Sequence, residues 1–332
     1  MTSKIFITLC VLVFSVTSSF GQFDKYTSFQ EMIPLAIKYF QENNLDSAIL
    51  VSEYAYKKFP AEDEDVISFL GGLYTENGQF AKATAIWKAG HAKEYCFGLN
   101  NPAYDEYYKE NSDFKKLAAL EHSWNESSHL EHEVILPADY DENRNYPIIF
   151  ILHGNSSSIK RAKKSWRSQM MNEKCISTFV QSYAFSNKNK AEYKWEFNDE
   201  KTLKELTNIY NRVMANHSVD TTKIIFAGMS AGGYMAIDLA FNEIIPITGL
   251  VLNCPVVSNI NDSTIVQFIE LKKKIGIITG EHDFALNDQK SLMNSINKQS
   301  GLNKLTINKD KGHEFTEEFS SLLDEYLKWI LE

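Results

Sequence analysis

Residues 223–233 read KIIFAGMSAGG, in which an apolar run passes abruptly into small residues around a serine. The apolar part, 223–228, predicts a buried strand, and the residues that follow the motif, YMAIDLAF, predict a helix. Ser230 therefore occupies a tight turn between a strand and a helix, where its backbone must be strained. Gly228 and Gly232 stand two residues before and after it, which gives the G-x-S-x-G pattern of a nucleophilic serine.

The chain around this motif alternates apolar strands with helices. Such alternation predicts an α/β fold with a mostly parallel sheet and helices on both of its faces. In sheets of this kind the functional groups gather at the carboxyl ends of the strands. The expected strands are 131–137, 147–152, 175–184, 223–228, 247–253, 274–279 and 304–308, and the expected helices include 160–172, 198–216 and 316–331.

Two polar residues follow later strands of this predicted sheet. Asp283 comes after the strand 274–279, and His313 comes after the strand 304–308. In the proteins that this pattern resembles, the acid and then the histidine follow the serine along the chain. We therefore expect a catalytic triad of Ser230, Asp283 and His313. The alternatives nearby are Glu281 and Asp288 for the acid and His282 for the base.

The segment Leu152-His153-Gly154-Asn155 ends the expected strand 147–152. With the serine motif, it makes residues 130–332 resemble the α/β-hydrolase superfamily. The segment 135–154 looks like the start of this fold in the secreted carboxylesterases related to polyhydroxybutyrate depolymerases and feruloyl esterases. The resemblance implies that His153 braces the loop and that the backbone N–H of Asn155 stabilises an oxyanion. The loop departs from the family at 155–158, where Asn-Ser-Ser-Ser replaces a run richer in glycine.

The second expected oxyanion donor is the backbone N–H of Ala231, because it lies at the start of the helix after the serine. Aromatic residues near the expected site are weaker candidates for substrate contacts. Trp195, with its neighbours Tyr193 and Phe197, lies on an extended segment, and packing against the sheet edge is an equally good interpretation. Phe284 directly follows the expected acid.

These residues predict a serine hydrolase, most simply one that cleaves carboxylic esters of small molecules. A serine peptidase and an acyltransferase use the same chemistry and stay open. A non-catalytic binding protein is the alternative from another class. The chemistry needs no cofactor, and Glu281-His282-Asp283 lacks the paired-histidine spacing of a zinc motif, so no metal is expected.

The N-terminal residues 1–21 predict a cleaved signal peptide and hence an exported protein, periplasmic or secreted. Lys4 precedes an apolar run from Ile5 to about Val16, and small residues at Ser19 and Gly21 fit a cleavage site. The apolar run is too short for a stable membrane span.

Residues 22–122 form a separate helical domain in this prediction, followed by the catalytic domain 123–332. Within 27–95, similar residues recur at an offset of 35, as in tetratricopeptide repeats. A groove for a protein partner is one role for such repeats, and structural support of the neighbouring domain is the other. The matched pairs include Leu35 with Leu70, Ala48 with Ala83, and Ala55 with Gly90.

The composition of the 332 residues excludes several classes of protein. Hydrophobic residues make up 44% and charged residues 23%, which excludes a mostly disordered chain and a multi-span membrane protein. The formal net charge of −9 argues against nucleic-acid binding, because an acidic surface repels phosphate. After the predicted signal peptide only Cys96, Cys175 and Cys254 remain, too few for a disulfide scaffold.

Overall fold

The computed structural model describes residues 23–99, 104–105, 107–109, 111–197, 199–257 and 260–332. The expected signal peptide, residues 1–21, lies outside the described residues. The chain divides between Trp124 and Asn125 into two compact units, and each is presented by itself. In the described ranges, no helix combines the length and the apolar character needed to cross a bilayer.

The first unit consists of helices. Side-chain caps mark two of the starts. Ser28 Oγ accepts a hydrogen bond from the N–H of Glu31, and Asn44 Oδ1 accepts one from the N–H of Ser47. The helices are α2 (Phe29–Gln41), α3 (Leu45–Lys58), the short 3₁₀ helix η2 (Pro60–Glu62), α4 (Asp63–Glu76), α5 (Phe80–His91) and α6 (Ser112–Glu126). From α2 to α5 each helix packs on the next along the chain, and Trp87 of α5 contacts the ring of Phe114 on α6.

Small residues lie where these helices touch. Ala48 and Ala83, one of the pairs matched at an offset of 35, are fully buried. Gly71 faces Trp87 so closely that a Cβ on Gly71 would lie 2.1 Å from the indole nitrogen. The unit thus contains two successive helix pairs held together by small side chains. Their assignment to the tetratricopeptide family stays a prediction.

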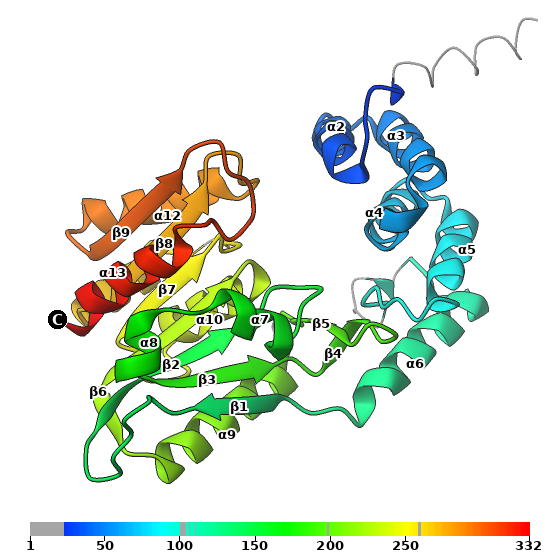
Figure 1. Cartoon of the computed structure of the whole chain (residues 1–332). Coiled ribbons are helices and arrows are strands. Elements are labelled where there is room, and N and C mark those ends of the chain that lie inside the picture. Colours follow the sequence, from blue (N-terminus) through cyan, green and yellow to red (C-terminus); the bar gives the residue numbers. More distant parts are fainter. Residues whose placement is uncertain (1–22, 100–103, 106, 110, 198, 258–259) are drawn as a thin grey trace, which may run out of the picture. The chain divides into compact units, whose positions relative to one another are not determined.

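The second unit is built around a seven-stranded sheet of order β1-β3-β2-β6-β7-β8-β9 (Figure 1). β1 runs antiparallel to β3, and the other neighbouring pairs in this sheet are parallel. The strands are β1 (Glu131–Ile135), β2 (Tyr146–Leu152), β3 (Ile176–Gln181), β6 (Val219–Met229), β7 (Gly249–Asn253), β8 (Lys274–Gly280) and β9 (Leu302–Asn308), and a separate hairpin contains β4 (Ala184–Asn187) and β5 (Glu192–Lys194).

Helices cover both faces of this sheet. Alternate residues of β2 show the two cores, because Phe150 packs in the core with α9 to α12 and Ile151 packs in the core with α7, α8 and α13. This confirms the predicted α/β fold with a mostly parallel sheet. The helices are α7 (Ile159–Ser165), α8 (Gln169–Lys174), α9 (Glu200–Asn216), α10 (Ala231–Phe241), α11 (Asp262–Glu270), α12 (Leu286–Lys298) and α13 (Phe319–Leu331).

One expected helix, 160–172, is divided into α7 and α8, so that part of the prediction is wrong. The break falls at Trp166, whose backbone leaves the helical conformation. The indole is 2% exposed and packs edge-on against the rings of Phe315 and Phe319. Burial of this large ring outweighs the one turn of helix that is lost.

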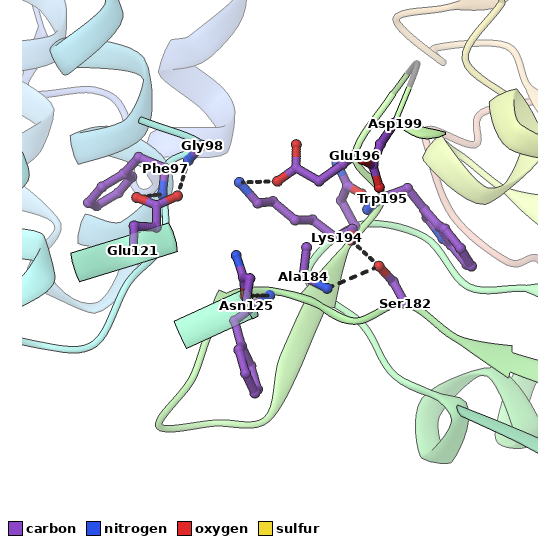
Figure 2. Close-up of polar contacts among 12 residues, drawn as sticks. Phe97, Gly98, Glu121, Asn125, Ser182, Ala184, Lys194, Trp195, Glu196 and Asp199 are labelled. Carbon is purple, nitrogen blue, oxygen red and sulfur yellow. Dashed lines mark hydrogen bonds and ion pairs between the residues drawn. The ribbon is translucent and has the colours of Figure 1, made fainter. Parts of the chain in front are cut away.

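The expected strand 175–184 is also wrong in extent, because the chain turns at Ser182 into the β4–β5 hairpin. Ser182 Oγ accepts a hydrogen bond from the N–H of Ala184 and donates one to the carbonyl of Lys194, at 3.3 and 2.5 Å (Figure 2). The hydroxyl therefore satisfies backbone groups on both arms of the hairpin, which a continuous strand would have paired within the main sheet.

The parallel strands place the beginnings of five loops at one edge of the sheet. Leu152 at the end of β2 pairs with Gly228 near the end of β6, and Met229 pairs with Asn253 at the end of β7. Gly280 at the end of β8 pairs with the last residue of β9. The loops after β2, β6, β7, β8 and β9 therefore all leave the sheet on the same side.

Candidate active site

Ser230 lies at the turn between β6 and α10 with φ 53° and ψ −118°. This left-handed conformation is costly for a residue with a Cβ, and backbone hydrogen bonds hold it in place. The Ser230 N–H donates to the carbonyl of Asn253 at 3.1 Å, and the Ser230 carbonyl accepts from the N–H groups of Tyr234 and Val256. The strained turn that the sequence predicted is therefore present.

The two glycines of the motif are required by close approach of the backbone. A Cβ on Gly228 would lie 2.4 Å from the carbonyl of Gly232, and a Cβ on Gly232 would lie 2.3 Å from the carbonyl of Leu152. The start of α10 therefore presses against both its own strand and the end of β2. This contact sets the position of Ser230 relative to the loop that follows β2.

We expect Gly232→Ala to destabilise the protein by about 2 kcal/mol or more, because β2 and α10 must separate to admit the methyl group. Urea unfolding followed by circular dichroism measures the change. Gly72→Ala is the matched control, since nothing lies within 4 Å of a Cβ at that helical position. An unchanged unfolding midpoint for Gly232→Ala would contradict the close approach.

His313 and Asp283 meet at the same edge of the sheet. His313 Nδ1 lies 3.1 Å from Asp283 Oδ2. Asp283 is 6% exposed, and its carboxylate also accepts hydrogen bonds from Thr279 Oγ1 and from the N–H of Ala285. Burial by itself would raise the pKa of Asp283, but the hydrogen bonds from His313, Ala285 and Cys254 outweigh it and lower the pKa to about 2. Asp283 is therefore ionised near neutral pH.

The alternative residues are placed differently. Glu281, His282 and Asp288 are exposed, and Glu281 accepts a hydrogen bond from the N–H of Asp310. Asp283 accepts the hydrogen bond from His313, so the structure brings together the pair that the sequence favoured.

Ser230 and His313 line one cavity of about 260 Å³. Among the described residues, the Ser230 hydroxyl and the His313 imidazole form no hydrogen bond with each other. Catalytic hydrogen bonds of this kind commonly shorten only when substrate binds. The cavity also has an apolar wall that contains Trp166 and Phe315. A larger cavity of about 610 Å³ along α9 is lined by none of the candidate site residues.

The two expected oxyanion donors lie beside this cavity. The Ala231 N–H is the first of helix α10, where no earlier turn supplies an acceptor for it. Asn155 lines the cavity, and its backbone N–H donates to no protein acceptor among the described residues. Both groups are therefore available to a negatively charged oxygen near Ser230.

His153 is buried beneath the loop and braces it. Its Nδ1 lies 2.7 Å from the carbonyl of Gly154, and its Nε2 lies 3.1 Å from the backbone nitrogen of Ser182. Because the Ser182 nitrogen is a donor, Nε2 accepts and the ring proton is on Nδ1. Burial lowers the pKa of His153 to about 4, so the ring is neutral near neutral pH.

The aromatic candidates are not gathered into one pocket. Trp195 is 2% exposed and is not among the residues that line the cavity, which fits the alternative interpretation of packing. Its contact with substrate stays a prediction. Its indole N–H needs an acceptor and finds the carbonyl of His153 at 2.6 Å, which holds the ring behind the loop. Phe284 is 70% exposed, and its ring centroid lies 4.5 Å from that of His313. Its role in substrate binding stays a prediction.

Two residues near the site were missed by the sequence analysis. Asn253 is 1% exposed, and its Nδ2 donates to the carbonyl of Glu314, next to His313. Thr279 donates from Oγ1 to the carboxylate of Asp283. Each is a polar residue at the carboxyl end of an apolar strand, and this pattern can be seen in the sequence.

Cys254 lies directly beneath the acid and the histidine. Its Sγ and the polar atoms of Asp283 and His313 lie within 4.8 Å of one another, the spacing of possible metal ligands. Burial and the adjacent Asp283 raise the pKa of the Cys254 thiol to about 12, so it is a neutral thiol and neither a nucleophile nor a ready ligand. Cys96, Cys175 and Cys254 are all buried and form no disulfide.

Comparison with known proteins gives no family model and no curated protein that matches this chain. Solved structures that resemble it include an uncharacterized protein from Bacillus cereus ATCC 10987, with 17% identity and a TM-score of 0.48, covering 92% of this chain and 99% of that one.

Two further similar structures are esterases by their descriptions, and each covers 60% of the chain. A thermophilic esterase from Thermogutta terrifontis, Est2, bound to propionate, has 16% identity and a TM-score of 0.47, covering 60% of this chain and 89% of that one. A ferulic acid esterase has 15% identity and a TM-score of 0.47, covering 60% and 91%. At such identities the function must be argued from the geometry of the site.

Proposed function

We propose that the chain is a serine hydrolase that cleaves carboxylic esters through an acyl-enzyme. One observation supports this most strongly. Ser230, held at φ 53°, shares a cavity with His313, and the imidazole of His313 is hydrogen-bonded to the buried carboxylate of Asp283. A carboxylate on Nδ1 leaves Nε2 to accept a proton, which is what activation of a serine requires.

In the first half of the reaction, Ser230 Oγ attacks the ester carbonyl carbon while His313 Nε2 takes the hydroxyl proton. The carbonyl oxygen becomes an oxyanion, which the N–H groups of Ala231 and Asn155 stabilise. One such donor contributes about 3 kcal/mol to transition-state stabilisation in comparable sites. His313 then gives its proton to the leaving alcohol, and the acyl group stays on Ser230.

In the second half, a water molecule gives a proton to His313 and attacks the acyl-enzyme. The same two N–H groups bind the second oxyanion, and Ser230 leaves with the proton from His313. Asp283 stays ionised throughout and stabilises the imidazolium that forms in each half. Ser230 and His313 thus regain their starting protonation states, because the Ser230 proton leaves on the alcohol and a water proton replaces it. The products are an alcohol and a carboxylic acid.

Esters are proposed because the His-Gly and G-x-S-x-G motifs resemble those of secreted carboxylesterases. The signal-peptide pattern of residues 1–21 supports export as part of the same proposal. A serine peptidase or an acyltransferase would use the same residues and differ only in the leaving group or the acceptor.

The purified full chain should hydrolyse 4-nitrophenyl acetate and react covalently with a fluorophosphonate at Ser230. In that reaction the Oγ–P bond forms, the P–F bond breaks and fluoride leaves. Release of 4-nitrophenol measures the hydrolysis, and peptide mass spectrometry locates the label. Label on another residue, or no turnover of any ester, would contradict the proposal.

A substrate panel separates the remaining alternatives. Faster cleavage of a peptide amide than of its matched ester would make the protein a peptidase. Acyl transfer to added methanol that is faster than hydrolysis by water would make it an acyltransferase. Ester cleavage faster than amide cleavage, with water as the main acyl acceptor, supports the proposed function.

A further inference from the structure

The loop after β2 is fastened along its length in a way that its sequence does not suggest. Asn155-Ser156-Ser157-Ser158 contains no glycine, yet Ser156 has φ 52°, a conformation that favours glycine. Contacts from outside must therefore hold the loop in this shape. Most of them come from β5 of the β4–β5 hairpin and the residue that follows it.

Trp195, immediately after β5, makes two hydrogen bonds to this loop. Its indole Nε1–H donates to the carbonyl of His153 at 2.6 Å, and its backbone N–H donates to Asn155 Oδ1 at 2.9 Å. The ring also packs against the His153 imidazole, with centroids 5.1 Å apart. Trp195 thus binds the loop at His153 and at Asn155, on both sides of Gly154.

The strand β5 itself fastens the next residues. Tyr193 and Ser157 exchange two backbone hydrogen bonds, at 2.8 and 3.3 Å. Arg161 donates from Nη1 to the carbonyl of Ser156 at 2.8 Å and from Nη2 to the buried carboxylate of Glu192. These contacts give each of the residues 156 and 157 a partner on or beside the hairpin.

The hairpin is in turn anchored to the rest of the second unit. Ser182 joins its arms, through the carbonyl of Lys194 and the N–H of Ala184 (Figure 2). The Ser182 N–H donates to His153 Nε2, so hairpin and loop share one connected set of hydrogen bonds. The β5 end, where Trp195 lies, is therefore a fixed support.

The orientation of the peptide between Gly154 and Asn155 connects the hairpin to the proposed oxyanion site. His153 Nδ1–H holds the carbonyl of Gly154, and in a planar trans peptide the N–H of Asn155 points the opposite way. The direction of that N–H depends on where His153 and the Asn155 side chain are held. Trp195 holds both of them.

We propose that Trp195 is a positioning residue, which aims the Asn155 N–H at the oxyanion from behind the loop. This rests on the proposed function, since it assumes an oxyanion at Ser230. Trp195 touches neither the cavity nor the reacting atoms. The hairpin after β3 thereby holds the loop in a conformation that glycine would adopt more readily.

Trp195→Phe tests this, because it removes the indole N–H and keeps an aromatic ring. We expect kcat for 4-nitrophenyl acetate to fall about tenfold with KM changed less than twofold, since removing such a donor outright costs 10²–10³ in kcat. The matched control is Trp329→Phe on α13, which loses an indole of the same unit and should keep the wild-type kcat.

The rate ratio of an ester to its matched thionoester separates a positioning role from a merely structural one, because a structural role would leave this ratio unchanged. Sulfur accepts hydrogen bonds more weakly than oxygen, so a working oxyanion donor favours the oxygen ester over the matched thionoester. That preference should shrink in Trp195→Phe. It should also shrink in Asn155→Ala, because alanine keeps the backbone N–H of residue 155 but removes the Oδ1 acceptor. The double variant should lose less than the product of the two single losses, because both act on one peptide.

The outcomes separate the two proposals. If the fluorophosphonate labels Ser230 and Trp195→Phe keeps the wild-type kcat, only the role of Trp195 is overturned. If Trp195→Phe slows both esters by the same factor, Trp195 is a structural residue and the inference is wrong. If the wild-type chain is not labelled at Ser230, the proposed function fails first.

Discussion

Ser230→Ala should reduce ester hydrolysis by roughly 10⁶-fold, to the level left by binding and oxyanion stabilisation alone. Ser230 lies on a strained turn at φ 53° and lines the same cavity as His313, whose imidazole is hydrogen-bonded to the buried carboxylate of Asp283. Alanine keeps the backbone and its hydrogen bonds to Asn253, Tyr234 and Val256. The thermal unfolding midpoint should therefore stay within about 2 °C of the wild type.

The measurement is the initial rate of 4-nitrophenol release together with the unfolding midpoint of the same sample. Ser320→Ala is the control, because Ser320 is exposed on α13 and should keep full activity. Activity retained in Ser230→Ala would remove the serine mechanism. A lost fold together with lost activity would leave the fluorophosphonate label of the wild type as the deciding measurement.

The sheet and the placement of the polar residues could be predicted from local patterns. Apolar runs of strand length mark β2, β6, β7 and β8, because each is buried on both faces of a parallel sheet. Once the strands are parallel, their carboxyl ends share an edge. Asp283 and His313 must then come close, although 30 residues separate them, and they are hydrogen-bonded in the structure.

The details that the sequence did not predict depend on single polar or aromatic side chains. The break at Trp166 follows from burial of one ring, and the turn at Ser182 follows from one hydroxyl that bonds to two backbone groups. Hydrophobic periodicity carries no information on such bonds. It also cannot distinguish a tryptophan that lines a cavity from one that packs behind it, and for this reason both interpretations of Trp195 stayed open.

Asp283→Asn should lower kcat by about 10⁴-fold with the fold retained. The carboxylate accepts the His313 Nδ1–H, and an asparagine amide can present its N–H₂ group there instead. The imidazole then carries its proton on Nε2, where it cannot take the proton of Ser230. Asp288→Asn is the matched control, because Asp288 is exposed on α12, and its kcat should equal that of the wild type.

The same substitution has an effect on stability that depends on pH. The pKa of Asp283 is lowered to about 2 in the folded state, from an ordinary value of 3.8. A lowered pKa means that the folded state favours the ionised carboxylate, so this group stabilises the fold at pH above the unfolded value. The contribution is on the order of 2 kcal/mol near neutral pH and is lost as the pH falls from about 4 through 2.

Asparagine does not titrate, so the wild type and Asp283→Asn should differ most in unfolding free energy near pH 7. The difference should shrink as the pH is lowered from 4 toward 2, because only the wild type loses the carboxylate there. Urea unfolding at pH 7, 4 and 2.5 measures it. A difference that stays constant over this range would mean that Asp283 is not held ionised by its hydrogen bonds, and the acid of the site would then have to be sought elsewhere.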